Sequence, residues 1–277
     1  MRFRPLCAAS VVLVLSACDR TPPEPIKKDN VTTTTSSSSS PSTGSAMGGG
    51  GTQSLTRSTP TRGGQGNVVV AKKPTSPIQP SPDDPIAGKW TIEDAQKAVP
   101  GTGAFVATID TSMGAVQCKL EGDKAPITTA NFVGLATGKR VWKHPVSKKW
   151  VNSPAYDNTT FHRVIQGFMI QGGDAAGNGM GDAGYEIPDE VWENAVHDRA
   201  GLLCMANKGP DTNSAQFFIT DAKAAHLDNG YTIFGECAPL DVVHKIAGVE
   251  KNARDKPLTP VTIKKVTISR ADPKKKE

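Results

Sequence analysis

The run TFHRVIQGFMIQGGD (residues 160–174) places an arginine, Arg163, and a glutamine, Gln171, among phenylalanine, valine, isoleucine and methionine. A charge in apolar surroundings is costly unless a partner pairs with it. Arg163 therefore either extends its guanidinium to water or faces a cleft where a ligand supplies the partner. In the second case its chemistry would be that of a charged hydrogen-bond donor rather than that of a nucleophile.

Other chemistries find little support in the sequence. No cysteine lies in a recognisable nucleophile setting. The glycine-rich stretch 172–184 lacks the spacing of a dinucleotide-binding fingerprint followed by a helix, so we interpret it as a loop. Four histidines are scattered without the spacing of metal ligands, and we expect structural or surface roles for them: His144, His162, His197 and His244. The sequence therefore implies no metal and no cofactor.

Composition divides the 277 residues into two parts. Residues 19–88 contain no phenylalanine, tryptophan or tyrosine and are rich in serine, threonine, proline and glycine. Such a stretch cannot bury enough apolar surface to offset its chain entropy, which predicts a disordered tether over residues 18–88. The net charge of +5 includes a basic tail, but no basic face interleaved with aromatic residues is evident, which disfavours nucleic-acid binding.

The elements that would position Arg163 are mostly short strands. Apolar and polar residues alternate at 104–110 and 115–121 around a glycine turn, which predicts two paired strands. In the segment 260–269 the apolar phase slips between Ile263 and Val266, which indicates a bulge. Further strands are predicted at 160–165, 168–171, 202–207, 216–220 and 232–235. The pattern favours a mainly β, closed or nearly closed antiparallel barrel.

Helical spacing appears in two segments that would cap this barrel, 125–138 and 239–249. Residues 139–158 are polar and interrupted by proline, so we expect a loop. Before the barrel, Thr91 is placed to cap a short helix in the segment 90–99, with Trp90 packing that helix onto the domain.

Three motifs in this part resemble the signatures of the cyclophilin-type peptidyl-prolyl cis-trans isomerases. They are FHRVIQGFMIQGGD, GLLCMANKGPDTNSAQFFIT (201–220) and HLDNGYTIFGE (226–236). The resemblance runs in order from residue 104 to residue 269. It implies a closed eight-stranded antiparallel β-barrel capped by two α-helices, and it implies isomerisation of X–Pro bonds.

Isomerisation of an X–Pro bond is slow because the twist breaks amide resonance. A catalyst must favour the twisted amide over both planar forms. In the twisted state the prolyl nitrogen becomes an acceptor, and the resemblance implies that Arg163 donates to it. Its planar guanidinium holds a direction that a lysine could not. Gln171 matches the glutamine that orients this arginine and contacts the substrate backbone.

The resemblance also implies a set of substrate-binding residues. Ala206 and Asn207 match the segment that holds the residues before proline. The remaining members would line the pocket or its rim: Phe168, Met169, Gln216, Phe218, His226, Leu227 and Tyr231.

Three positions depart from the best-known pattern of the family. His226 stands where many members have tryptophan, so we expect weak cyclosporin binding with isomerase activity retained. Tyr231 stands where many have histidine and still offers a hydroxyl and a flat face. Lys208 replaces a small residue, which predicts a preference for acidic side chains near the proline.

The N-terminal residues are typical of a secretory signal peptide. Arg2 and Arg4 precede an apolar run that is too short to span a bilayer, which predicts a signal peptide over residues 1–17. The end of this run, LSAC, resembles the bacterial lipobox and implies lipid attachment at Cys18. We therefore expect a lipid-anchored protein of the bacterial cell envelope, outside the cytoplasm, with the domain at residues 89–273 and a basic tail at residues 274–277.

Three cysteines remain in the domain: Cys118, Cys204 and Cys237. Their apolar neighbours favour small buried side chains, and a disulfide is the alternative that the compartment would permit.

The sequence thus predicts a monomeric isomerase of proline-containing secreted or envelope proteins. The alternative is a membrane-tethered binding module or chaperone for such segments, with incidental turnover.

Overall fold

The computed structural model describes residues 78–271, so the predicted signal peptide, Cys18 and most of the predicted tether lie outside the described residues. The alternating residues at 104–121 form β2 (Phe105–Thr111) and β3 (Gly114–Leu120), which pair antiparallel as predicted. In both strands the buried positions alternate with more exposed ones, because one face of the pair covers the core.

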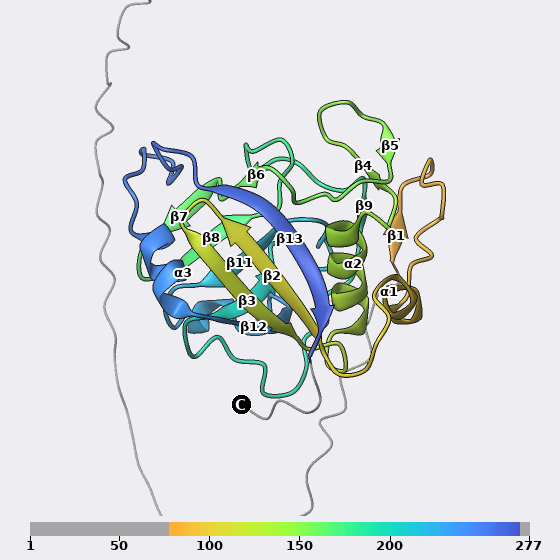
Figure 1. Ribbon diagram of the computed structural model, residues 1–277, viewed down its shortest axis with the longest axis horizontal. Coiled ribbons are helices and arrows are strands. Elements are labelled where there is room, and N and C mark those ends of the chain that lie inside the picture. The colour runs from red at the N-terminus through yellow and green to blue at the C-terminus, as the bar shows by residue number, and fades with distance from the viewer. Residues whose placement is uncertain (1–77, 272–277) are drawn as a thin grey trace, which may run out of the picture. The chain divides into compact units, whose positions relative to one another are not determined.

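Within residues 78–271, nine strands form one antiparallel sheet in the order β6-β13-β2-β3-β12-β10-β11-β8-β7 (Figure 1). Its other members are β6 (Thr159–Thr160), β7 (Arg163–Ile165), β8 (Met169–Gly172), β10 (Leu202–Met205), β11 (Phe217–Thr220), β12 (Ile233–Ala238) and β13 (Thr262–Arg270). The bulge predicted in the last strand is confirmed, since its register with β2 shifts between Ile263 and Lys265.

The two end strands of this order, β6 and β7, are separated along the chain only by Phe161 and His162. The Phe161 N–H donates to the carbonyl of Val261 over 3.0 Å, and the His162 N–H donates to the carbonyl of Gln171 over 3.0 Å. The chain therefore changes its partner from β13 to β8 at this point and closes the sheet on itself. Counted as one strand, β6 and β7 complete the predicted eight-stranded barrel.

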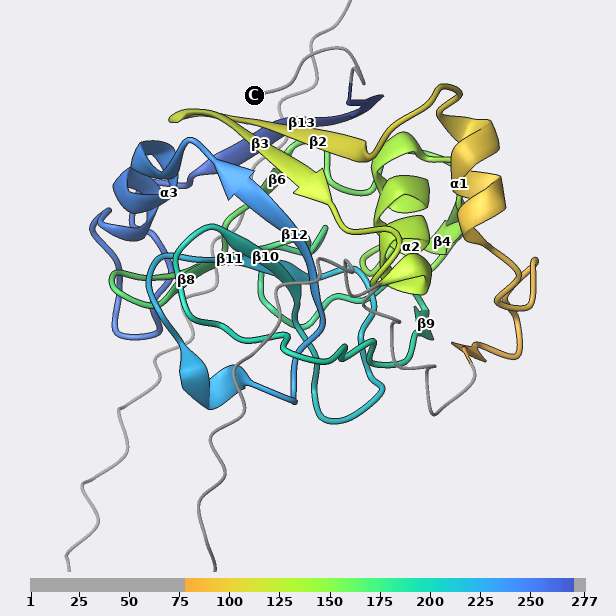
Figure 2. The same cartoon turned by 90° about the horizontal axis from the view of Figure 1, so that it is seen from below.

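Two helices lie at opposite ends of the barrel, α2 (Pro126–Thr137) and α3 (Leu240–Ala247), as Figures 1 and 2 show. The start of α2 has no side-chain cap of its own from Ala125. Instead the buried carboxylate of Glu190 accepts hydrogen bonds from the N–H groups of Ile127 (3.0 Å) and Thr128 (2.7 Å). Burial raises the pKa of Glu190 despite these bonds. A loop residue thus fixes one end of the barrel.

The core between α2 and the sheet is aromatic. Phe132 of α2 stacks on Tyr156 at 5.0 Å between ring centroids and meets the edge of Phe217 at 5.5 Å. Phe234 of β12 completes the group at 5.3 Å from Phe132. These contacts anchor the interior faces of β11 and β12, and the next residue of β11, Phe218, belongs to a second apolar cluster.

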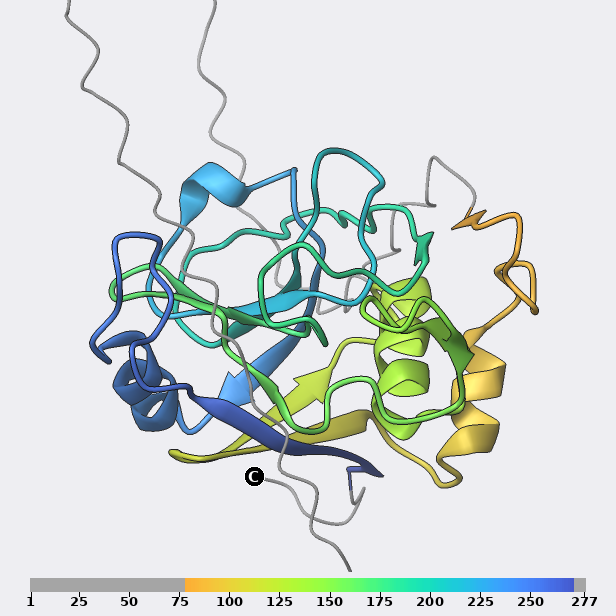
Figure 3. The same ribbon diagram turned by 90° about the horizontal axis from the view of Figure 1, so that it is seen from above.

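The predicted helix before the barrel is confirmed as α1 (Ile92–Ala98), with Thr91 forming a capping box with Asp94. Trp90 donates from its indole nitrogen to the carbonyl of Ala130 over 2.8 Å, which attaches α1 to α2. Figures 2 and 3 show the two helices side by side. No helix within residues 78–271 is long and apolar enough to cross a bilayer.

Two predictions, the end of the disordered tether and the loop at 139–158, need correction. Residues 78–88 belong to the predicted tether by composition, yet β1 (Gln79–Pro80) pairs with β9 (Tyr185–Glu186), and Asp84 is buried. The stretch 139–158 contains a small hairpin of β4 (Trp142–Lys143) and β5 (Trp150–Val151). In both cases strands of two residues are too short to show alternation in the sequence.

The cysteine alternatives are resolved in favour of a disulfide for one pair. Cys118 of β3 and Cys237 of β12 stand opposite each other in the strand register and are bonded. Cys204 is a buried free thiol, and burial raises its pKa, so it packs as a small apolar side chain.

Candidate active site

Neighbouring strands bring the two predicted catalytic residues together. Arg163 of β7 and Gln171 of β8 are paired across the ladder, so their side chains project from the same face of the sheet. Their separation in sequence is spanned by the turn before β8, in which Gly167 has a φ of +73°. The sequence pattern therefore places a cation and an amide side by side because the two strands form a hairpin.

An apolar pocket, as it is called below, lies beside them. It is lined by nine of the eleven site residues that the sequence predicted in the domain: Arg163, Phe168, Met169, Gln171, Ala206, Asn207, Phe218, Leu227 and Tyr231. Met169, Phe218 and Leu227 are almost fully buried and pack in one cluster, which forms the apolar wall. The guanidinium thus faces a cleft, which was the second of the two alternatives for Arg163.

Arg163 is not locked in place by other charges. Its side chain is 43 % exposed, and its Nε atom lies 3.8 Å from the Oδ2 atom of Asp255. Asp255 is itself held at 2.7 Å by the ammonium of Lys251, and its carbonyl accepts the Val164 N–H over 2.8 Å. Within residues 78–271 the guanidinium therefore has a distant carboxylate on one side, and its remaining donors are available to a ligand.

The role expected for Gln171 differs from its contacts in the structure. Its amide donates to the Oε1 atom of Gln216 over 3.0 Å, and the described residues show no hydrogen bond between Gln171 and Arg163. Gln216 is fixed in turn by donating to the carbonyls of Gly179 (3.1 Å) and Gly181 (2.7 Å). Gln171 is therefore oriented from the glycine-rich loop, while the carboxylate nearest to Arg163 is that of Asp255.

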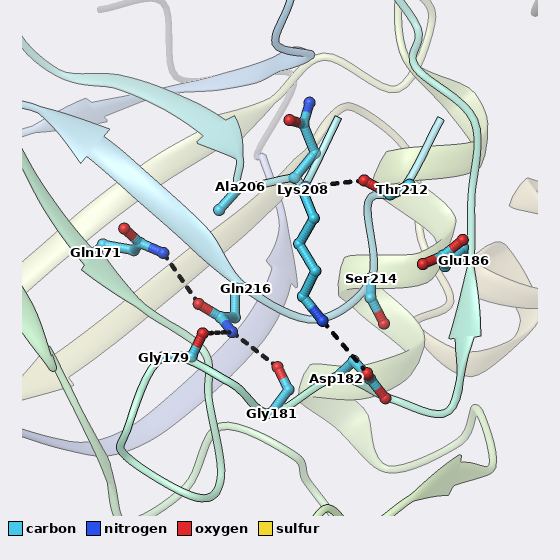
Figure 4. A pocket seen from close by; sticks show the side chains of 11 residues that line it. Gln171, Gly179, Gly181, Asp182, Glu186, Ala206, Lys208, Thr212, Ser214 and Gln216 are labelled. Carbon is cyan, nitrogen blue, oxygen red and sulfur yellow. Dashed lines mark hydrogen bonds and ion pairs between the residues drawn. The ribbon is translucent and has the colours of Figure 1, made fainter. Parts of the chain in front are cut away.

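A second cavity, the side cavity, adjoins the apolar pocket and shares Gln171, Ala206 and Asn207 with it. Its other lining residues are Gly179, Gly181, Asp182, Glu186, Lys208, Thr212, Ser214 and Gln216 (Figure 4). Gln216 therefore lines this neighbouring polar cavity rather than the apolar pocket. Lys208 spans the cavity to within 3.6 Å of Asp182, so its ammonium already has a partner of opposite charge.

The glycine-rich loop that lines the side cavity is organised by Asp174. This residue is 1 % exposed, and its carboxylate accepts the N–H groups of Ala176 (2.7 Å), Asn178 (3.0 Å) and Gly179 (2.7 Å). Burial opposes the charge, but these backbone donors outweigh it and lower the pKa of Asp174. The acid nearest to Arg163 in the motif thus holds a loop and does not pair with the arginine.

The rim of the apolar pocket comes from the 3-10 helix η1 (Ala225–Leu227) and the residues after it. His226 lies 5.1 Å from the ring of Phe168 but does not line the pocket. Tyr231 meets the ring of Phe218 edge-on at 5.7 Å. Of the two aromatic departures from the family pattern, only Tyr231 contributes to the wall.

Some residues that shape the site were missed by the sequence reasoning. Asp221 accepts the Gly167 N–H over 2.6 Å and donates its own N–H to the Phe168 carbonyl over 2.8 Å, which fixes the turn carrying Phe168. Asp255 belongs to a loop distant in sequence from Arg163. Neither carboxylate lies in a pattern that distinguishes it from surface acids, so no sequence signal identified them.

His162, next to Arg163, is 6 % exposed. Burial lowers its pKa, so the imidazole is uncharged near neutral pH. It therefore adds no second positive charge beside the guanidinium, in keeping with the structural role expected for it.

Comparisons with known proteins bear on this arrangement. Residues 106–268 match the family model described as cyclophilin type peptidyl-prolyl cis-trans isomerase. Peptidyl-prolyl cis-trans isomerase A of Mycobacterium tuberculosis is 45 % identical over 166 residues, which cover 59 % of this chain and 91 % of that protein. Peptidyl-prolyl cis-trans isomerase B of Streptomyces anulatus is also 45 % identical, over 58 % of this chain and 95 % of its own length.

Solved structures give the same result. A cyclophilin type peptidyl-prolyl cis-trans isomerase of Cryptosporidium parvum is 30 % identical, with a TM-score of 0.54, and covers 62 % of this chain and 100 % of its own. A second structure of that protein, in the presence of the dipeptide Ala-Pro, has a TM-score of 0.52 at 30 % identity and covers 60 % of this chain and 99 % of its own.

Proposed function

This chain belongs to the cyclophilin-type peptidyl-prolyl cis-trans isomerase family, and we propose that its isomerase activity depends on the guanidinium of Arg163. The single observation that carries the proposal is the placement of an incompletely paired cation at the edge of an apolar pocket. The proline ring of the substrate packs against the apolar wall formed by Met169, Phe218 and Leu227. The X–Pro bond then lies beside Arg163.

Twisting the X–Pro bond removes the resonance that keeps the prolyl nitrogen planar. The nitrogen lone pair becomes an acceptor only in the twisted state, so a donor aimed at it stabilises that state selectively. Arg163 supplies the donor, and its charge strengthens the hydrogen bond in a pocket from which the proline ring excludes water. No bond is made or broken, and no proton has to move.

Raising the isomerisation rate from roughly 0.01 to roughly 1,000 per second requires about 7 kcal/mol of selective stabilisation. One fixed donor in a preorganised site contributes about 2.7–4 kcal/mol. Burial of the proline ring and positioning of the backbone supply the rest. Ala206 and Asn207 line both cavities, which supports the proposal that they hold the residues before proline while a preceding side chain enters the side cavity.

The exchange rate of a short Ala–Pro peptide, measured by NMR with wild type and Arg163→Ala, tests this assignment. We expect the substitution to reduce catalysed exchange about 10²–10³-fold and to change the peptide dissociation constant little. Equal exchange rates would contradict the role of Arg163. If Arg163→Ala abolishes exchange but the chain still performs its envelope function in cells, the alternative of a binding module is favoured.

We further propose that the enzyme acts on secreted or envelope proteins from a lipid anchor at Cys18. The pattern of residues 1–18 supports this, and so does the disulfide between Cys118 and Cys237, because disulfides persist mainly outside the cytoplasm. Membrane fractionation of cells expressing wild type or Cys18→Ser tests the anchor. Release of only the Cys18→Ser protein into the soluble fraction is expected, and equal fractionation of the two proteins would contradict it.

A further inference from the structure

A segment outside the family match, residues 78–90, packs against the barrel beside the side cavity, and it is called the strap below. Its strand β1 pairs with β9, so that Gln79 stands opposite Glu186 and Pro80 opposite Tyr185. Figure 1 shows β1 next to β9, with α1 on the same side of the barrel. Glu186 is one of the side-cavity residues, so the strap contacts the strand that supplies part of the cavity wall.

Asp84 stabilises a turn within the strap. Its carboxylate accepts the N–H groups of Ile86 (3.0 Å) and Gly88 (3.1 Å), which form a tight turn. Gly88 has a φ of +74°, and a Cβ at this position would lie 3.0 Å from the Cγ2 atom of Ile78. The turn is therefore specified by a carboxylate at one residue and by a glycine at another.

The same carboxylate pairs with an arginine of the domain. The Nη2 atom of Arg140 lies 3.1 Å from the Oδ2 atom of Asp84, with side chains 2 % and 0 % exposed. The guanidinium also lies 3.8 Å above the ring of Tyr185 and donates to the carbonyl of Val141. Two buried charges tolerate desolvation only when their hydrogen bonds are completed, as they are here.

Tyr185 continues this network to the side cavity. Its hydroxyl donates to the Oδ1 atom of Asn131 over 2.6 Å, and the Asn131 amide donates to the Ser214 carbonyl over 2.7 Å. The Ser214 hydroxyl donates to the Tyr185 carbonyl over 2.8 Å and accepts the Ala183 N–H over 2.9 Å. Ser214 lines the side cavity, as Figure 4 shows. The network thus connects the strap with the cavity wall through buried hydrogen bonds.

We propose that the strap determines specificity by positioning the wall of the side cavity through the Asp84–Arg140–Tyr185 network. The inference rests on the proposed function, in which residues before proline lie over that cavity. The lining side chains are largely polar, so the enzyme selects substrates with a polar side chain ahead of the X–Pro bond. Asp84 and Arg140 are positioning residues, because neither reaches the substrate.

The test compares kcat/KM for peptides of the form Xaa-Ala-Pro, with glycine, alanine, glutamine or glutamate at Xaa, using the full chain. For Asp84→Asn we expect the ratio of the glutamine to the glycine peptide to fall about fivefold, while the glycine peptide changes less than about twofold. Gly88→Ala strains the strap without leaving a buried charge unpaired, and a smaller change in the same direction is expected.

Asp83→Ala is the matched control. Asp83 is an exposed strap residue that pairs with Lys143 and does not belong to the Asp84–Arg140–Tyr185 network, so its removal should leave the peptide ranking unchanged. An unchanged ranking in folded Asp84→Asn and Gly88→Ala would overturn the proposal. An equal loss on every peptide would also overturn it, because the role would then be general stability. If the wild-type chain turned over no peptide, the proposed function would be overturned as well. This outcome is distinguishable from the two above, in which the wild-type chain is active.

Discussion

Arg140 and Arg163 lie in two regions of the molecule that differ in how far they bury an arginine side chain and how closely they pair it. Arg140, between the strap and the barrel, is 2 % exposed, with a carboxylate at 3.1 Å and an aromatic ring beneath it. Arg163, at the apolar pocket, is 43 % exposed, with its nearest carboxylate at 3.8 Å. The first guanidinium has its interactions completed by the fold, whereas the second keeps donors for a ligand. Residue type alone therefore does not identify a catalytic arginine. What distinguishes it is that the described part of the fold leaves some of its guanidinium donors unpaired.

The largest expected effect is on the free energy of unfolding, which should fall much more in Arg140→Ala than in Arg163→Ala. Removing one partner of a buried ion pair leaves an uncompensated charge, so Arg140→Ala should lower the free energy of unfolding by about 3–5 kcal/mol. Arg163→Ala should change it by less than about 0.5 kcal/mol, because its side chain is half exposed. Urea denaturation of the two variants measures both values. Similar losses would mean that the contrast between the two regions is wrong.

A second prediction concerns the rim of the apolar pocket. His226 lies beside Phe168 without lining the pocket, and a tryptophan there would add apolar area and an N–H donor. His226→Trp should tighten cyclosporin binding about tenfold, corresponding to about 1.4 kcal/mol. Calorimetric titration measures the change, with His226→Ala as the control that adds neither group. Equal affinities of wild type and His226→Trp would contradict the expectation that His226 weakens cyclosporin binding.

A third prediction concerns Asp255, whose distant carboxylate would orient the guanidinium of Arg163. Asp255→Ala should lower kcat about fivefold, or about 1 kcal/mol, with little change in KM, because the planar substrate does not depend on that orientation. Asp110→Ala is a matched control, since Asp110 forms a similarly long ion pair with Lys264 at 3.9 Å. A rise in KM without a change in kcat would assign Asp255 to substrate binding instead.

The smallest expected effect concerns acid stability. Backbone N–H groups lower the pKa of Asp174 below its usual value of 3.8, so the carboxylate stabilises the fold above that value and loses its contribution as the pH falls through the lower folded-state pKa. Asp174→Asn should therefore be less stable than wild type at pH 7, and the difference should narrow below about pH 3.8. Denaturation curves across pH 2–7 measure this, and a constant difference would contradict it.

The barrel could be predicted from the sequence because alternation along its longer strands is local information. Even the bulge near Ile263 appeared as a slip in the apolar phase. The strap could not be predicted, because its composition is that of the tether. Its folded conformation depends on the pair between Asp84 and Arg140, which are 56 positions apart.

The candidate site shows the same limit. Long motifs identified most residues of the apolar pocket through their family resemblance. The residues that hold them, such as Asp221 and Asp255, act through contacts between distant segments, and acids of this kind have no distinctive local pattern. Gln216 was assigned to the right region, but only the structure shows that it lines the adjoining cavity and orients Gln171.

The central claim is that a directed guanidinium, and not merely a positive charge, stabilises the twisted amide. NMR exchange measurements on Arg163→Lys test it most directly, since lysine keeps the charge but lacks the planar set of donors. The account predicts at least about a tenfold fall in kcat with the peptide dissociation constant within about twofold of wild type. Wild-type turnover by Arg163→Lys, or a loss confined to peptide binding, would contradict it.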